Sequence, residues 1–256
     1  EFMEASYPEV RVVRNSENLG FAEGMNVGIR ASKGEYVVSL NNDTETDPHW
    51  LAELVRQMDR HPEMGSAASA LMDFKDRSRI DSLGDGYWLD GRSYKVGSAQ
   101  LFHPVTEPFE ILCPCAAASI YRSSMLKRIG LFDKDFFAYM EDVDLGLRAQ
   151  LAGYRSICIP TAFVYHMGSA TSGGGASAFT IRQTTRNIYR VIIKTVPLLL
   201  LPIFMLFALS SQLGLVVLSL VLPQFRWFRL HIRAYFEGLA HALRDLPGNF
   251  VRRRQV

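Results

Sequence analysis

The chain has 256 residues, enough for one α/β domain with a complete core and an appendage. Its formal net charge is only +2 at pH 7, so no overall electric field favours a nucleic acid as partner. Cys113, Cys115 and Cys158 lack a second Cys/His pair at zinc-finger spacing, which argues against a structural zinc site and favours buried free thiols in a reducing compartment.

The first predicted element is a strand at residues 10–13, and little sequence precedes it. The chain opens Glu1-Phe2-Met3 without a signal peptide and reads as though it starts inside a domain. We therefore expect N-terminal sequence of this domain to be missing.

Strands and helices alternate in the first part of the chain. Helices are predicted at residues 21–31 and from Pro48 to about residue 60, with Asp47 as a cap, and strands at residues 36–40 and 66–72. This alternation favours an α/β fold with a mostly parallel sheet covered by helices on both faces. Because ligands bind beyond the carboxyl ends of such strands, chemistry is expected just after Leu40.

The alternation continues less regularly after residue 72. Residues 73–110 carry turn signals and no clear element. Strands are then predicted at residues 111–121, 155–159 and 162–165, and helices at residues 123–129, 139–151 and 179–194. The Gly/Ser-rich residues 171–177 predict a mobile loop.

Two polar groups have the composition of a metal site. Asn41-Asn42-Asp43 follows a buried strand, and a carboxylate in such a loop suits Mg²⁺ or Mn²⁺, although these residues also form a good turn. His166 ends a predicted strand before glycine-rich sequence, where a histidine is a metal ligand, a phosphate contact or a structural residue.

Three carboxylates, Glu141, Asp142 and Asp144, open a predicted helix whose dipole favours anions. One interpretation is helix capping with an Asp144–Arg148 pair one turn apart. The other is that one carboxylate deprotonates an acceptor hydroxyl.

A further stretch, residues 18–26, has glycines that permit close backbone approach near a helix N-terminus, although Gly20 could simply start that helix. Together these groups resemble the family 2 glycosyltransferases, most closely the rhamnosyltransferase-type members, over about residues 10–190. The resemblance rests on Asn18-x-Gly20-Phe21-Ala22-x-x-x-Asn26, Gly34-Glu35-Tyr36, Leu40-Asn41-Asn42-Asp43-Thr44, Gly130-x-Phe132-Asp133 through Glu141-Asp142-x-Asp144-Leu145-x-x-Arg148, and His166.

The resemblance implies a GT-A fold, which is Rossmann-like, and Mg²⁺ or Mn²⁺ as cofactor. It implies Asp43 and His166 as metal ligands and Asp142 as general base, with Glu141 and Arg148 in support. It places six residues on the nucleotide side: Asn18, Gly20, Phe21, Asn26, Asn41 and Asn42.

The implied reaction is a single inverting displacement, in which the metal stabilises the leaving nucleoside diphosphate and Asp142 takes the proton of the acceptor hydroxyl. Two departures from the family pattern stand out. The family's earlier strand with a nucleotide-binding Asp is not visible before Val10. Cys113-Pro114-Cys115 replaces a Gly-Ala-type sequence that borders the acceptor side.

Residues 191–256 are expected to form a membrane-associated helical tail behind a catalytic domain at residues 1–190. Residues 195–222 are uncharged over more than the ~20 residues that a spanning helix needs, which fits a kinked spanning helix or a re-entrant hairpin. Residues 225–243 predict an amphipathic helix at a lipid surface, and Arg252-Arg253-Arg254 favours the cytoplasmic side.

We therefore expect a membrane-associated hexosyltransferase whose catalytic domain is cytoplasmic. Its partners would be a nucleotide-sugar donor, a saccharide or lipid-linked acceptor of cell-envelope polysaccharide synthesis, and membrane lipid, but no nucleic acid. Rhamnose is suggested as the sugar by the resemblance alone. The alternatives are a non-catalytic nucleotide-sugar-binding remnant and a membrane-anchored scaffold.

Overall fold

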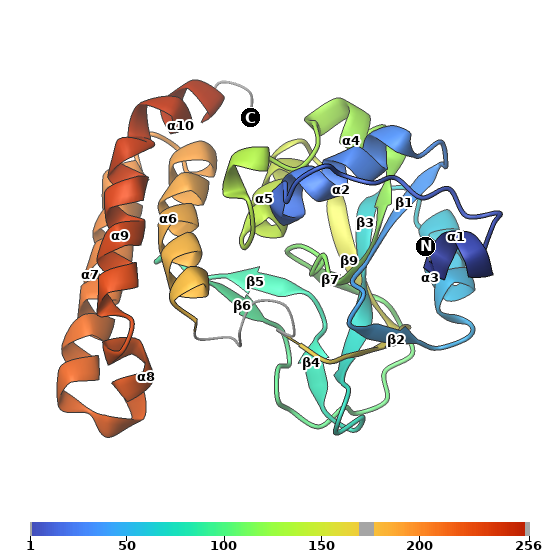
Figure 1. Ribbon diagram of the computed structural model, residues 1–256, viewed down its shortest axis with the longest axis horizontal. Helices are drawn as coiled ribbons and strands as arrows, with labels where there is room; N and C mark the ends of the chain where they lie inside the picture. The colour runs from blue at the N-terminus through green and yellow to red at the C-terminus, as the bar shows by residue number, and fades with distance from the viewer. Residues whose placement is uncertain (1, 169–176, 254–256) are drawn as a thin grey trace.

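A computed structural model describes residues 2–168 and 177–253 of the chain. A mixed β-sheet lies beside a layer of C-terminal helices, and shorter helices cover the sheet (Figure 1). The strand order β1-β8-β3-β9-β2 is formed by Tyr36–Leu40, Ala118–Arg122, Met64–Asp73, Arg155–His166 and Thr44–Thr46. The shorter strands are β4 (Ile80–Ser82) on β3, β7 (Phe109–Ile111) on β9, and the separate pair β5 (Asp85–Tyr87) and β6 (Ser93–Lys95).

The sheet is mixed, but the expectation that it is mostly parallel is wrong. Within the described residues only β3 and β9 pair in parallel, and every other neighbouring pair runs antiparallel. Parallel pairing needs a long crossover, usually a helix. Here β4 turns straight back on β3, and β8 enters between β1 and β3 after an irregular segment.

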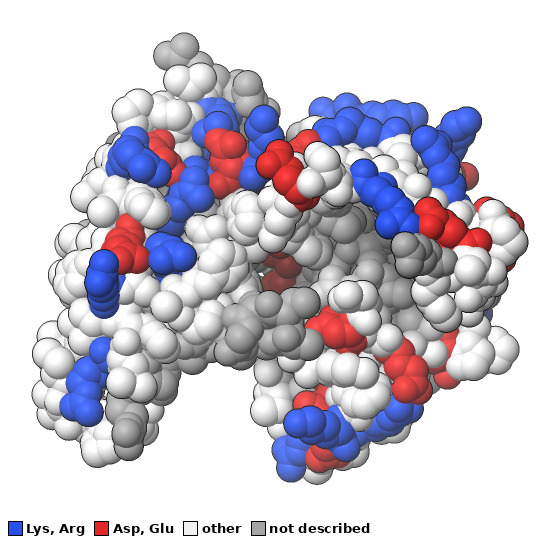
Figure 2. All heavy atoms as spheres, viewed as in Figure 1, with Lys and Arg blue, Asp and Glu red and all other residues white. Residues whose placement is uncertain are grey.

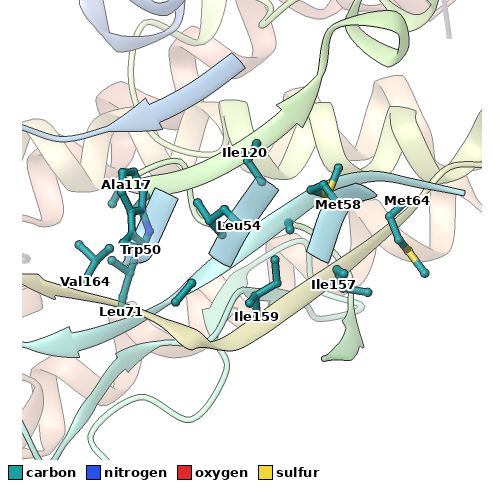
Figure 3. Packing of buried hydrophobic residues seen from close by; sticks show 13 residues of the cluster. Trp50, Leu54, Met58, Met64, Leu71, Ala117, Ile120, Ile157, Ile159 and Val164 are labelled. Atoms are coloured by element: carbon teal, nitrogen blue, oxygen red, sulfur yellow. The ribbon is translucent and has the colours of Figure 1, made fainter. Parts of the chain in front are cut away.

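Helix α3 (Trp50–Arg60) covers one face of the sheet. Trp50, Leu54 and Met58 lie one turn apart on its buried side and pack against Ile120 and Ile157 of the strands (Figure 3). The helix begins two residues later than predicted.

The opposite face is covered by α2 (Gly20–Ala31), α4 (Ser123–Ile129) and α5 (Glu141–Leu151), which pack against Val37 and Tyr121. Helices α2 and α4 confirm the predicted ranges within one residue. Helix α5 begins two residues after the predicted start, because Tyr139 and Met140 have φ angles of 69° and 70°, which no right-handed helix accommodates.

Three other sequence predictions need correction. Residues 10–13 form no strand, since their side chains are exposed and they pair with no described strand; only the short helix α1 (Phe2–Ser6) precedes them. The strand predicted at residues 111–121 is divided between β7 and β8. Residues 155–165 form one strand, β9, whose register shifts around Pro160 because proline cannot donate to a ladder. Of the predicted mobile loop, residues 171–176 lie outside the described residues.

The C-terminal layer consists of α6 (Ala178–Thr195), α7 (Leu201–Val221), α8 (Arg226–Arg229), α9 (Ile232–Arg244) and α10 (Leu246–Arg253), with short 3₁₀ turns at Lys134–Phe136 and Pro223–Phe225. Helix α6 confirms the predicted amphipathic helix, and its apolar face packs against Phe136 and Met140 of the sheet domain. The proposed division after residue 190 falls inside this helix.

The amphipathic helix predicted at residues 225–243 is interrupted at Leu230 and His231. Its second part, α9, packs on α6 and buries Ala234, Tyr235 and Ala242. A protein neighbour therefore covers the apolar face that the sequence had assigned to lipid.

A buried ion network joins α5 to α6. Asp144 is fully buried, with Arg148 Nε at 2.8 Å and Lys194 Nζ at 2.6 Å. Lys194 Nζ also lies 2.8 Å from Asp133. Charges removed from water are tolerated only when they are closely paired, so this network fixes the two helices relative to each other.

Lys194→Met is expected to destabilise the protein by about 3–5 kcal/mol, because it removes the buried cation that Asp133 and Asp144 share and leaves Asp144 with Arg148 alone. Urea unfolding would measure the loss. The matched control is Arg233→Met, which removes a cation from an exposed pair with Glu237 and should cost less than about 1 kcal/mol. Equal effects of the two substitutions would show that the buried network does not hold the helices together.

Candidate active site

A cleft of about 910 Å³ opens between the sheet, the β5–β6 hairpin and α6. Figure 2 shows a hollow between the two layers with acidic atoms deep inside it. The cleft brings together most of the residues singled out from the sequence: Asn18, Gly20, Phe21, Asn41, Asp43, Glu141, Asp142 and His166.

Asn26, Asn42 and Arg148 do not line this cleft. The buried amide of Asn26 donates to Phe132 O at 2.8 Å and accepts from Phe132 N at 3.0 Å. The guanidinium of Arg148 is occupied by Asp144 and by the carbonyls of Ile129 and Leu131. Both residues thus hold the fold together, and Asn42 is an exposed turn residue beside the cleft.

Strand pairing brings Asp43 and His166 together. Thr44 of β2 lies opposite His166 of β9, and Met167 N donates to Asp43 O at 3.0 Å. The Asp43 carboxylate consequently lies 3.5 Å from His166 Nε2. The other ring nitrogen, Nδ1, lies 2.8 Å from Asp81 Oδ2, at hydrogen-bond distance.

A divalent cation fits this pair of side chains. His166 is 8% exposed, and its buried Nε2 has no hydrogen-bond partner among the described residues. A buried nitrogen without a partner costs free energy, unless a ligand occupies its lone pair. Asp43 supplies the carboxylate oxygen that Mg²⁺ and Mn²⁺ prefer, so Asp43 and His166 are the side chains that could hold either ion.

Glu141 and Asp142 stand in the first turn of α5, at the end of the helix that favours anions. Ala116 N donates to Asp142 Oδ2 at 3.3 Å, and Val143 N donates to Oδ1 at 2.9 Å. Burial raises the pKa of Asp142 despite these hydrogen bonds. Burial and then the neighbouring Asp142 charge raise the pKa of Glu141 well above its usual range. Asp144 therefore pairs with Arg148, as the first interpretation of the acidic stretch expected, while Asp142 faces the cleft and its role as a base stays a prediction.

The segment before α5 has a strained backbone. Phe137, Tyr139 and Met140 all have positive φ angles of 64° to 70°, which non-glycine residues rarely adopt. The buried amide of Asn187 on α6 donates to the carbonyls of Phe136, Ala138 and Tyr139 at 2.8–3.1 Å. Asn187 thereby holds the segment that aims Asp142.

Gly20 is needed beside this segment. Its φ is +74°, and a Cβ there would lie 2.5 Å from the ring of Phe137. Phe137 thus makes the close approach to the backbone that Gly20 permits.

The sequence missed two charged residues that line the cleft, Asp85 and Lys95, whereas Cys115, which the sequence had singled out, lines it as well. One ligand atom from each of Asp85, Cys115 and Asp142 lies within 4.8 Å of the others. Burial and then the Asp142 charge raise the pKa of Asp85 well above its usual range. Asp85 lies in the acidic run from Asp81 to Gly86, which could have indicated a site. The acidic residues of this run were interpreted as turn residues instead.

The comparisons with known proteins agree with this geometry. The family model "Glycosyl transferase family 2" matches residues 1–130. This range includes Asp43, Asp81, Asp85 and Lys95 and ends before Asp142 and His166.

Two curated relatives each match more than half of the chain. The N-acetylglucosaminyl-diphospho-decaprenol L-rhamnosyltransferase of Mycobacterium tuberculosis (strain CDC 1551 / Oshkosh) is 27% identical in an alignment that covers 65% of this chain and 62% of that protein. The O-antigen biosynthesis protein RfbC of Myxococcus xanthus is 30% identical in an alignment that covers 57% of this chain and 12% of that protein. The chain therefore spans less than two thirds of the length of these relatives.

Solved structures show the same fold. The mannosyltransferase PcManGT from Pyrobaculum calidifontis, in complex with GDP-Man and Mn²⁺, superposes with a TM-score of 0.53 at 15% identity, covering 94% of this chain and 72% of that one. GalNAc-T7 with UDP, GalNAc and Mn²⁺ gives a TM-score of 0.57 at 16% identity, covering 72% of this chain and 37% of that one. At this identity the likeness establishes the GT-A fold alone.

Asp85→Asn is expected to stabilise the fold by about 1–3 kcal/mol at neutral pH, because it removes a buried carboxylate whose charged form burial disfavours. A raised pKa means that the folded chain holds the proton more tightly, so the wild type loses stability as the pH rises through that pKa. Urea unfolding at several pH values measures the effect.

The gain should disappear at acid pH, where Asp85 of the wild type is already protonated. Glu35→Gln, at an exposed position, is the control and should change stability little at any pH. A destabilised Asp85→Asn protein at neutral pH would contradict the assignment of Asp85 as a strained carboxyl group.

Proposed function

This chain belongs to glycosyl transferase family 2, and we propose that it moves a sugar from a nucleotide-diphosphate donor to a hydroxyl of a saccharide or lipid-linked acceptor, with inversion. The observation that carries the proposal is the single cleft shared by the Asp43–His166 pair and Asp142. The Asp43–His166 pair can hold a cation next to a diphosphate, and Asp142 can accept a proton.

The donor would bind on the side formed by Asn18, Gly20, Phe21 and Asn41. These residues lie at the N-terminus of α2 and just after β1, where α/β folds bind nucleotides. A divalent cation held by Asp43 and His166 would stabilise the negative charge that grows on the leaving diphosphate. Two structural neighbours of this fold were crystallised with Mn²⁺, which supports a divalent metal without separating Mn²⁺ from Mg²⁺.

Asp142 would act as the general base. Two backbone amides orient its carboxylate, and its raised pKa makes it a stronger base than an exposed aspartate. As the acceptor oxygen attacks the anomeric carbon, its proton passes to Asp142, and the bond to the diphosphate breaks on the opposite side. One displacement of this kind inverts the anomeric configuration.

The relatives support a role in cell-envelope polysaccharide synthesis. The Mycobacterium relative is named as a rhamnosyltransferase acting on a diphospho-decaprenol acceptor, and the Myxococcus relative is named for O-antigen biosynthesis. We propose rhamnose as the transferred sugar and a lipid-linked saccharide as the acceptor on this basis.

We also propose that the chain contacts a membrane through α7, with the cleft on the cytoplasmic side. Within the described residues, α7 is the one helix long and apolar enough to cross a bilayer. Its exposed apolar side chains include Ile203, Leu206, Phe207, Val217 and Leu220. Arg252 and Arg253 of α10, which favoured the cytoplasmic side in the sequence, contact Asp135 and the carbonyls of Ile193 and Val196 in the structure.

The contacts of α7 favour a helix that lies in the lipid interface over one that spans the bilayer. Ser211, at its middle, donates to Asp90 Oδ2 at 2.7 Å in the turn between β5 and β6. The middle of a spanning helix would lie in hydrocarbon, where a charged partner such as Asp90 is costly. An interfacial helix keeps this contact and still buries its apolar side in lipid.

Asp142→Asn is expected to lower the turnover number about 10²–10⁴-fold while donor and metal binding persist, because only the proton acceptor is lost. Wild-type turnover should fall as the pH falls through the raised pKa of Asp142, since protonation removes the base. Release of nucleoside diphosphate from dTDP-rhamnose with Mn²⁺ and a lipid-linked acceptor measures both effects.

Asp59→Asn, at the exposed end of α3, is the matched control and should leave turnover unchanged. Asp43→Ala should weaken Mn²⁺ binding as well as turnover. Full turnover in Asp142→Asn would refute the base assignment. A binding remnant or a scaffold would show no turnover that depends on Asp142 or Asp43.

The paired substitution of Leu206→Gln with Val217→Gln is expected to weaken binding to anionic lipid vesicles more than tenfold, or by over about 1.4 kcal/mol, because both side chains lose apolar burial in lipid. Vesicle co-sedimentation measures the change. Leu89→Gln with Leu101→Gln, two comparably exposed residues of the sheet domain, is the control and should bind like the wild type. Unchanged binding of the α7 variant would rule out α7 as the lipid contact.

A further inference from the structure

The metal pair of the proposed function has a third residue behind it. Asp81 lies on β4, which pairs with β3, and β3 pairs in parallel with β9 up to the end that bears His166. Oδ2 of the Asp81 carboxylate lies 2.8 Å from His166 Nδ1, at hydrogen-bond distance. Its other oxygen, Oδ1, accepts from Lys95 Nζ at 2.7 Å. Side-chain contacts thus form a chain from Lys95 through Asp81 and His166 to Asp43.

This chain determines which nitrogen of His166 carries the proton. An ionised carboxylate only accepts hydrogen bonds, so the nitrogen that faces Asp81 must be the one bearing hydrogen. In a neutral imidazole the other nitrogen, Nε2, then presents its lone pair. That lone pair is buried, has no hydrogen-bond partner among the described residues, and lies 3.5 Å from the Asp43 carboxylate.

We propose that Asp81 is a positioning residue for the metal site: it fixes His166 in the Nδ1–H form with Nε2 directed at the cation, and Lys95 holds Asp81 in place. The inference rests on the proposed function, because it assumes that Asp43 and His166 bind a metal. Carboxylates that accept from a metal-bound histidine commonly orient the ring and raise its basicity. Asp81 is 20% exposed in its side chain and lies on a different strand from either ligand.

A simpler role for Asp81 is an ion pair with Lys95 that only stabilises the β4 region. The two roles differ at the imidazole. A stabilising ion pair leaves the protonation of His166 and the metal affinity unchanged when its loss does not unfold the protein. If Asp81 is a positioning residue, Asp81→Asn changes both the protonated nitrogen of His166 and the metal affinity, because the neutral amide holds the Nδ1 hydrogen less strongly.

Nitrogen-15 NMR of histidine-labelled protein tests the proposal without any metal. At a pH where the ring is neutral, wild-type His166 should carry its hydrogen on Nδ1, whereas Asp81→Asn should lose this preference. Titration with Mn²⁺ alone, followed through the broadening of the His166 signals, should give an affinity about 10–100-fold lower in Asp81→Asn than in the wild type. Nε2–H in the wild type, or equal Mn²⁺ affinities, would overturn the inference.

Two further variants separate this result from the metal site itself. Glu45→Gln removes one negative charge from β2, at an exposed residue paired with Arg77, and should leave the His166 form and the Mn²⁺ affinity unchanged. His166→Ala, with binding followed by Mn²⁺ relaxation of water protons, should lose most of its Mn²⁺ affinity. If His166→Ala binds Mn²⁺ normally, the proposed metal site fails; if only Asp81→Asn does, the metal site stands and the positioning role of Asp81 fails.

Discussion

The antiparallel register of β2 with β9 is the constraint on which the cleft depends. Placing Thr44 opposite His166 fixes Asp43, one residue earlier, against the imidazole ring. A slip of one residue would turn every side chain of β2 to the other face of the sheet and separate the two. The register is held by the backbone bond from Met167 N to Asp43 O and by the buried length of β9 in the core. A three-residue strand can thus carry an accurate site, because the long strand beside it is rigid.

Helix α6 provides the corresponding support for the Asp142 side of the cleft. The segment before α5 has a strained backbone, and burial raises the pKa of Glu141 and Asp142 in the first turn of α5. Both features favour a change in the position of this helix end. Asn187 of α6 donates hydrogen bonds to the backbone of that segment. Lys194, further along α6, forms an ion pair with Asp144 of α5. Residues well beyond the part matched by the family model therefore set the position of Asp142. The C-terminal layer is a structural part of the candidate site in addition to any role at a membrane.

The sequence predicted most elements and most of the cleft, and its errors have identifiable physical causes. Helices α2, α4 and α6 followed from apolar periodicity and end signals, because their buried faces repeat every turn. Strand direction could not be predicted, since periodicity says which side chains are buried but not which neighbour a strand pairs with. Asp43, Asp142 and His166 were found through motif order, whereas Asp85 and Lys95 lie on three-residue strands too short to show alternation. Asn26 and Arg148 belong to the same motifs, but their side chains do not line the cleft. Both donate hydrogen bonds to backbone carbonyls outside it.

The same limit explains why the sequence assigned the apolar face of residues 225–243 to lipid, in addition to residues 195–222. An amphipathic pattern shows that a helix has one apolar face, but it does not identify what covers that face. In α9 the cover is α6, which approaches so closely that a Cβ at Gly238 would lie 2.5 Å from Arg182 O. Helix α7 has weak amphipathic character, yet it leaves most of its apolar surface uncovered while Gln212 and Ser219 face the protein. A lipid contact through α7 therefore accounts for the surface that no described part of the chain covers, and the contact between Ser211 and Asp90 keeps the cleft close to that surface.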